Sequence, residues 1–203
     1  MSVLLAITAA LSLPSVNEQT VRHLARRLDF DSEEQTGAAR VTLWIDARGK
    51  VLDCQLVQFV GEEGFAKRMC EEVVGARFSA AKAKGGIHVH SMYTTTLGGS
   101  GGSVHRSGTM ANWVSGRSAA ADFVIQLSEV PPDLSWQKQI EVVALVEANG
   151  VVSQCESAGY AVADWTRIAC EQLRQTNLEM RQSRKGELIP YLRNLVVKFE
   201  AAQ

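Results

Sequence analysis

Apolar and polar residues alternate in two neighbouring stretches of the first half of the chain. Residues 41–45 read Val-Thr-Leu-Trp-Ile, and residues 50–58 continue the same two-residue period. This period is typical of strands with one buried face. The turn between the stretches ends in Gly49, and glycine readily adopts the positive φ that tight hairpin turns require. The pattern therefore predicts a β-hairpin.

A helical period follows the hairpin. Apolar residues recur every three or four positions over residues 62–75, which is the spacing of one helix face. Gly85-Gly86 then turns the chain into residues 87–97, where we expect a third strand. Residues 18–28 also have helical spacing and precede the hairpin. The apolar face of the 62–75 helix is formed by Phe65, Ala66, Met69, Cys70, Val73 and Val74.

The second half of the chain repeats this order of elements. Asn149-Gly150 is a strong hairpin signal, and it lies between expected strands at 140–146 and 151–156. Residues 163–175 have a helical period, and residues 187–199 alternate as a final strand.

The two halves align with each other, which indicates a duplicated unit. Gly49 falls on Gly150 at a shift of 101 positions (150 − 49 = 101), and Cys70 falls on Cys170 at a shift of 100 (170 − 70 = 100). Residues 112–126 are placed to supply the leading helix of the second copy. We therefore expect an α+β fold of two tandem modules. Each module is a three-stranded antiparallel sheet packed on a helix, in the order helix–strand–strand–helix–strand.

A glycine- and serine-rich stretch divides the chain of 203 residues. Residues 98–103 read Gly-Gly-Ser-Gly-Gly-Ser, a composition typical of flexible linkers. We expect a first module at 15–97, a linker at 98–111 and a second module at 112–203. Residues 1–14 form a candidate signal segment.

The N-terminus contains the apolar core of an export signal. The run from Val3 to Leu11 is apolar apart from Thr8. It is far shorter than the roughly 20 residues of a membrane span, and it matches the central region of a secretory signal. No Lys or Arg precedes it, so the alternative is an apolar helix or strand that packs on the fold.

The composition of the whole chain is that of an ordinary globular protein, with 46% hydrophobic residues and a net charge of −1. A nucleic-acid binder should carry a basic excess, so this charge argues against nucleic-acid binding.

Four cysteines occupy matching positions of the two halves. Cys54 and Cys70 are 16 residues apart (70 − 54 = 16), and Cys155 and Cys170 are 15 apart (170 − 155 = 15). From the first cysteine the strand runs on for roughly 20 Å, and the helix returns for roughly 12 Å. The two sulfurs can therefore meet where the helix crosses the sheet. For an exported protein we predict the disulfides Cys54–Cys70 and Cys155–Cys170, the pairing that respects the duplication.

Other chemistry has little support in the sequence. Zinc sites normally hold two cysteines within two to four residues of each other, and none here are so close. His88 and His90 share a strand face near His105, a pattern that is more often a surface feature than a ligand set. Cys70 and Cys170 face inward, which disfavours a reactive thiol. Because no known catalytic motif is present, we expect no enzymatic activity, metal, cofactor or small-molecule substrate.

One motif spans the first hairpin and its helix. Residues 41–57 read VTLWIDARGKVLDCQLV, a helix with Cys70 follows, and Arg77-Phe78 comes after it. This pattern resembles the TonB C-terminal domain family in its disulfide-containing variants. The resemblance covers residues 36–97 and, more faintly, 138–199.

The resemblance implies a periplasmic module that links an inner-membrane motor complex to outer-membrane transporters. Such modules grip an extended peptide by adding it to a sheet edge, where main-chain donors and acceptors are unpaired. The implied partner is a protein or peptide of the envelope, and the implied location is the periplasm, associated with the membrane. The expected edges are the last strands of the two modules, with the partner-binding residues Ile87, Val89, Ser91, Tyr93, Leu195, Val197 and Phe199.

The two halves match the family pattern unequally. The second half reads Asn177-Leu178-Glu179-Met180 in place of the Arg-Phe step, and the chain has only four prolines. A stand-alone periplasmic protein of two such domains therefore fits better than a full energy transducer. The alternative is an envelope assembly or stress factor with one binding and one structural module. An enzyme of unknown type is the weaker third alternative.

Overall fold

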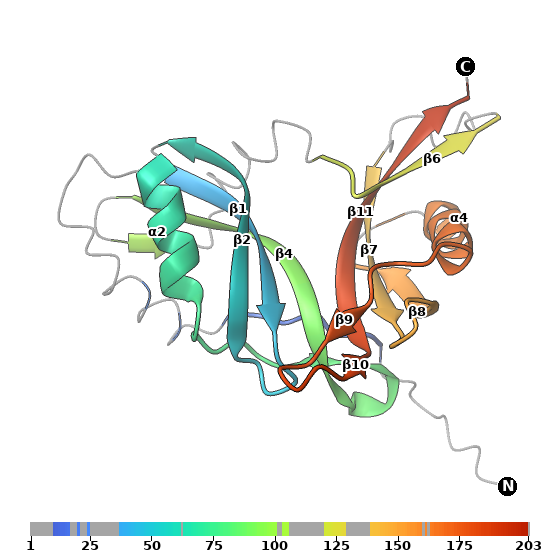
Figure 1. The fold of residues 1–203 in the computed structure, drawn as a ribbon. Coiled ribbons are helices and arrows are strands. Elements are labelled where there is room, and N and C mark those ends of the chain that lie inside the picture. Colours follow the sequence, from blue (N-terminus) through green and yellow to red (C-terminus); the bar gives the residue numbers. More distant parts are fainter. Residues whose placement is uncertain are drawn as a thin grey trace, which may run out of the picture.

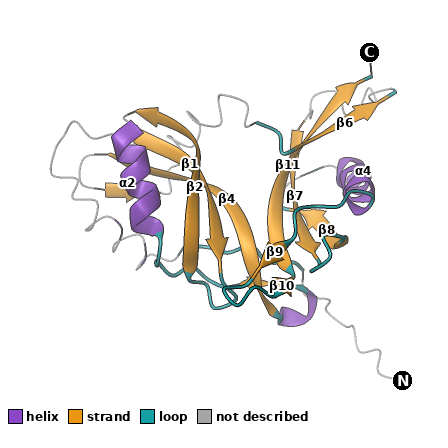
Figure 2. Cartoon of the chain, in the orientation of Figure 1, coloured by secondary structure: helices purple, strands orange, loops and turns teal. Residues whose placement is uncertain are grey.

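The computed structural model describes residues 10–16, 20, 24, 37–61, 63–100, 103–105, 120–128, 139–159, 161 and 163–202. Over these residues the fold is α+β, as predicted, with a mixed sheet and the helices α2 and α4 (Figures 1 and 2).

The first half folds in the predicted order of hairpin, helix and long strand. The hairpin turn closes with Gly49 at φ 83°, and Asp46 N donates to Lys50 O at 2.9 Å. Five of the six residues predicted for the apolar face of the helix are buried, whereas Val74 lies after the helix and is 40% exposed. The elements are β1 (Gly37–Ile45), β2 (Val51–Gly61), α2 (Glu63–Val73), β3 (Ala81–Lys82), the 3-10 turn η1 (Lys84–Gly86), β4 (His88–Ser100) and β5 (Ser103–His105).

The second half repeats this order. Its hairpin turn closes with Gly150 at φ 85°, and its helix buries Trp165 and Leu173. A short two-stranded hairpin, β9 with β10, lies between the helix and the last strand. The elements are β6 (Phe123–Leu127), β7 (Gln139–Val146), β8 (Val152–Ser157), α4 (Ala163–Arg174), β9 (Arg181–Gln182), β10 (Leu188–Ile189) and β11 (Tyr191–Ala201).

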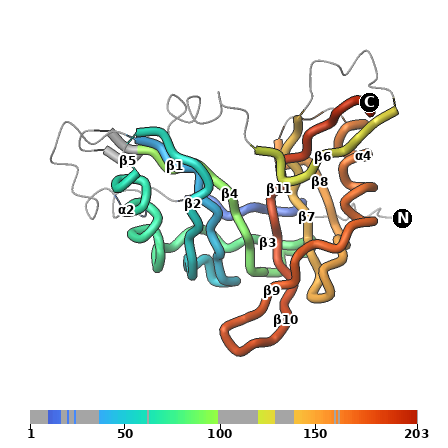
Figure 3. Tube along the Cα trace, turned by 45° about the horizontal axis from the view of Figure 1, so that its top comes forward, coloured from blue at the N-terminus to red at the C-terminus, as the bar shows by residue number. Residues whose placement is uncertain are grey.

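The strands of both halves form one continuous sheet in the order β2-β1-β4-β11-β7-β8. Figure 3 shows the two groups of strands meeting at β4 and β11. These two strands pair in parallel, from Tyr191 with His90 to Arg193 with Met92. The predicted pair of separate three-stranded sheets is therefore not confirmed.

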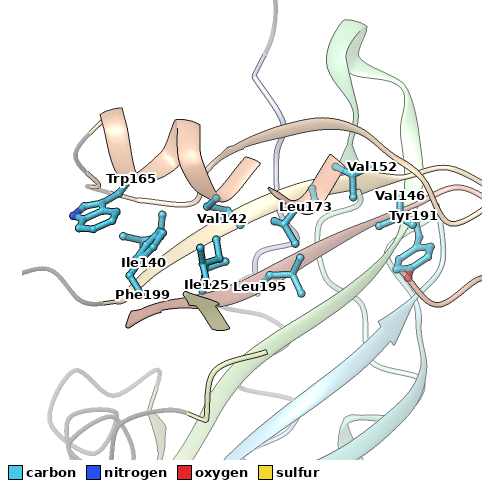
Figure 4. Packing of buried hydrophobic residues seen from close by; sticks show 13 residues of the cluster. Ile125, Ile140, Val142, Val146, Val152, Trp165, Leu173, Tyr191, Leu195 and Phe199 are labelled. Carbon is cyan, nitrogen blue, oxygen red and sulfur yellow. The ribbon is translucent and has the colours of Figure 1, made fainter. Parts of the chain in front are cut away.

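The two helices cover opposite faces of this sheet. On β1, Leu43 belongs to the hydrophobic core beneath α2, whereas its neighbour Trp44 packs against the core beneath α4. Successive side chains of a strand point to opposite faces, so the two cores lie on different sides. Figure 4 shows the core beneath α4, where Trp165 packs on Phe199 with ring centroids 4.0 Å apart.

A third hydrophobic cluster covers the face of the second half that is turned away from α4. Val143, Leu145 and Leu192 of this face pack against Leu11 and against residues of β3 and β4. Ser12 and Lys82 exchange two main-chain hydrogen bonds of 2.9 Å. Residues 11–13 therefore pack on the fold, whereas residues 1–9 lie outside the described part.

Two sequence predictions differ from the structure near the middle of the chain. A helix over residues 112–126 is wrong at its C-terminal end, because Phe123–Leu127 is a strand with alternating burial. Residues 98–100 of the predicted linker continue β4 and pair with β5. The predicted helix at 18–28 falls outside the described residues, apart from Thr20 and Leu24.

Among the described residues, no helix is long and apolar enough to cross a membrane.

Candidate functional site

Both predicted disulfides are confirmed. Cys54 is bonded to Cys70 and Cys155 to Cys170, with Cα–Cα distances of 5.5 and 5.6 Å. Each bond joins the outer strand of its half, β2 or β8, to the helix that crosses it. No cysteine is free, so no thiol is left to act as a nucleophile or metal ligand.

Six of the seven predicted partner-binding residues lie on β4 and β11, two inner strands of the sheet. β4 pairs with β1 from Ser91 to Gly99 and with β11 from His90 to Met92, and its two ends pair with the short strands β3 and β5. β11 pairs with β7 on one side, and with β4 and then β6 on the other. The premise that these strands are free edges is therefore corrected. Val89, Ser91 and Tyr93 lie in β4, and Leu195, Val197 and Phe199 lie in β11.

Ile87 differs from the other predicted residues because it precedes β4 and is 65% exposed. By contrast, Ser91, Leu195, Val197 and Phe199 are buried.

A buried asparagine marks the point where β4 and β11 separate. Asn194 Oδ1 accepts from Thr94 N at 2.7 Å, and Asn194 Nδ2 donates to Thr94 O at 2.8 Å and to Glu141 Oε1 at 2.6 Å. The amide therefore satisfies the main-chain groups of Thr94 that β11 no longer reaches.

An aromatic cluster joins the halves on the α4 face. Trp44 stacks on His90 and meets Tyr191 edge-on, each at 5.6 Å between ring centroids. The guanidinium of Arg181 lies 5.9 Å from the Trp44 ring centroid, within cation–π range. Burial lowers the pKa of the His90 imidazole. Burial also raises the pKa of Tyr191, whose hydroxyl donates to Glu179 O at 2.6 Å.

The outermost strands of the described sheet are β2 and β8. At the start of β2, Val51 N donates to Ala76 O, and Val51 O accepts from Gly75 N, both at 2.9 Å. Beyond Val51, β2 pairs only with β1 among the described residues. A β-bulge, where the register shifts between Gln58 and Leu56, presents Val57 at 50% exposure.

β8 is the shorter edge, with 6 residues against 11 in β2. Its Glu156 is held by Lys84 at 3.2 Å and by Leu11 N at 3.1 Å. The two halves therefore present unequal edges.

The described residues hold no group of three or more His, Cys, Asp or Glu side chains that could bind a metal ion. Of the two histidines that share a strand face in the sequence, His90 stacks on Trp44.

Sequence reasoning missed the residues that join the halves, namely Asn194, Trp44 and Arg181, and it missed Asp122, whose carboxylate binds β11. It also missed β6, although the alternation of Phe123, Ile125 and Leu127 with Val124 and Gln126 is a strand signal.

Comparison with protein-family models, with curated proteins and with solved structures finds no match to this chain.

Proposed function

We propose that this chain is a non-enzymatic protein-interaction protein of the bacterial envelope, exported to the periplasm and built from two tandem TonB-like modules. An extended segment of an outer-membrane transporter or another envelope protein adds to the edge of its sheet. The edge of β2 carries this proposal, because β2 is the longer outermost strand and, beyond Val51, pairs on one side only over the described residues. Main-chain hydrogen bonds would supply affinity, and side chains at alternate positions would select the sequence.

The Cys54–Cys70 bond supports this assignment of the edge. It fixes β2 to α2, so the strand is ordered before a partner arrives. A pre-ordered strand lowers the entropic cost of association. The bulge at Val57 also makes the edge irregular, which discourages indiscriminate pairing with other strands.

The second candidate function is an envelope assembly or stress factor with one binding and one structural module. The unequal edges favour this division of roles. β8 is short, and its Glu156 is already held by Lys84. The first half is then the binding module, and the second half supports it through β11.

Photo-crosslinking in the native host tests the β2 edge. A photoreactive amino acid at Val57 is expected to give an adduct with one envelope protein, because this side chain is 50% exposed on the edge strand. The matched control is the same probe at Val151, a valine that is 38% exposed beside β8. Mass spectrometry of the adduct should locate a single extended segment of the partner. Equal labelling at both positions, or none at Val57, would contradict the proposal.

The redox state of the cysteines tests the compartment. We expect all four cysteines to be oxidised in protein taken from the native host, because disulfides persist in oxidising compartments and are rare in the cytosol. Alkylation before and after reduction of the unfolded protein, followed by mass spectrometry, counts the free thiols. Cysteines that are alkylated before reduction would be free thiols in the host, and this result would contradict the periplasmic location.

A further inference from the structure

β6 is an extended segment seated on the edge of β11. The two strands pair in parallel over five residue pairs, from Phe123 with Val197 to Leu127 with Ala201. Further main-chain hydrogen bonds lie at the two ends of this pairing. Asp122 N, just before β6, donates to Val196 O at 2.8 Å, and Ala202 N, just after β11, donates to Leu127 O at 2.7 Å. The segment comes from the region between the two halves, so it is not one of the duplicated strands.

Side chains of this segment fix its position at alternate residues. Asp122 accepts from Val196 N at 2.8 Å and from Arg193 Nη2 at 3.4 Å. Ile125 is 5% exposed within the core beneath α4, and Phe123 and Leu127 pack against that core. Figure 4 shows Ile125 beside Leu195. The edge of β11 therefore binds a segment with an acidic residue followed by apolar residues at the first, third and fifth positions after it.

The rest of β11 does not depend on β6. β7 pairs with β11 over eight residue pairs, from Tyr191 to Lys198, whereas β6 contributes one fully buried side chain. Among the described residues, β6 pairs with no strand other than β11, and its Val124 is 45% exposed. Without β6, β11 would present an open edge from Val196 to Ala201, because β4 has already separated at Asn194.

We propose that the edge of β11 is a strand-accepting site, and that β6 is a built-in occupant which a partner segment of the same pattern replaces. The partner is an extended peptide with an acidic residue followed by alternating apolar residues, bound parallel to β11. This site is separate from the β2 edge, so the proposal shares with the proposed function only the mode of strand addition.

A labelled peptide corresponding to residues 121–128, Ala-Asp-Phe-Val-Ile-Gln-Leu-Ser, tests the site by fluorescence anisotropy on purified full-length protein. The protein variant Ile125→Ser removes the buried anchor of β6, and Val124→Ser changes the exposed neighbour as the matched control. A tethered occupant competes at an effective concentration in the millimolar range. We therefore expect the peptide to bind Ile125→Ser at least about tenfold more tightly than the native protein or Val124→Ser. A peptide with alanine at the Asp122 position should bind more weakly.

A second variant keeps the test valid if Ile125→Ser does not fold. Asp122→Ala leaves the core unchanged and removes the bonds of the Asp122 carboxylate to Val196 N and to Arg193, so it should also bind the peptide more tightly than the native protein. Circular dichroism and thermal unfolding establish that each variant is folded. Equal affinity for all four proteins, or no binding to a folded variant, overturns the proposal. Unfolding of both variants overturns it as well, because an exchangeable occupant is not required for folding. None of these results changes the outcome expected from crosslinking at Val57.

Discussion

Replacement of Gly49 by alanine is expected to lower the free energy of unfolding by about 4 kcal/mol, a large effect for a single methyl group. Gly49 has φ 83°, and a residue with a side chain loses about 1–2 kcal/mol in this region. The added Cβ would also lie 2.1 Å from Phe78 O, so the backbone around Phe78 must move. That movement breaks the bond from Phe78 N to Gly49 O, now 2.8 Å, and loosens a buried aromatic side chain.

Gly85→Ala is the matched control for this prediction. Gly85 has the same φ of 83°, but an added Cβ would meet nothing within 4 Å. Only the conformational cost applies, so we expect a loss of about 1 kcal/mol. Urea unfolding followed by circular dichroism measures both variants. Equal losses would show that the contact with Phe78 contributes nothing.

The same close approach occurs in the second half, which supports the alignment of the two hairpins. A Cβ at Gly150 would lie 2.5 Å from Leu178 O. The sequence predicts positive φ at both glycines from local turn chemistry. It does not predict the approach of residues 78 and 178, because this approach depends on how the chain returns after each helix.

Local periodicity accounts for much of the correctly predicted structure. Each hairpin and helix is set by contacts between residues close in sequence, each final strand has the two-residue period of a strand, and the same patterns recur in the second half. The disulfides were predictable for the same reason. Cys54 and Cys70 lie on apolar faces of consecutive elements, whose lengths bring them together.

The joining of the halves was not predictable from these patterns. An apolar strand such as β11 has the same alternation whether its edge is free or paired, so Leu195 and Val197 gave no sign that β6 lies beside them. Trp44 lies on the face opposite α2, and packing against the second half covers it in part. Asn194 is polar and looks solvent-exposed in sequence, yet it lies buried where β4 and β11 separate.

Removal of the first disulfide is expected to lower the free energy of unfolding by about 3 kcal/mol. The variant carries Cys54→Ala and Cys70→Ala together, so that no free thiol remains. The bond closes a loop between residues 16 apart in sequence, and chain entropy for a loop of this size gives about 3 kcal/mol. Urea unfolding under identical oxidising conditions measures the loss.

The matched control for this variant is the double substitution Cys155→Ala and Cys170→Ala, whose loop spans residues 15 apart. Because β4 and β11 pair at the centre of one sheet, we expect a single cooperative transition in both variants, shifted by nearly the same amount. Tryptophan fluorescence, to which Trp44 and Trp165 contribute among the four tryptophans of the chain, should follow the same curve as circular dichroism. Two separate transitions, with only the altered half shifted, would show that each half unfolds independently. The contacts of Asn194 and Trp44 between the two halves would then contribute little to stability. The second half would not support the first half and its β2 edge.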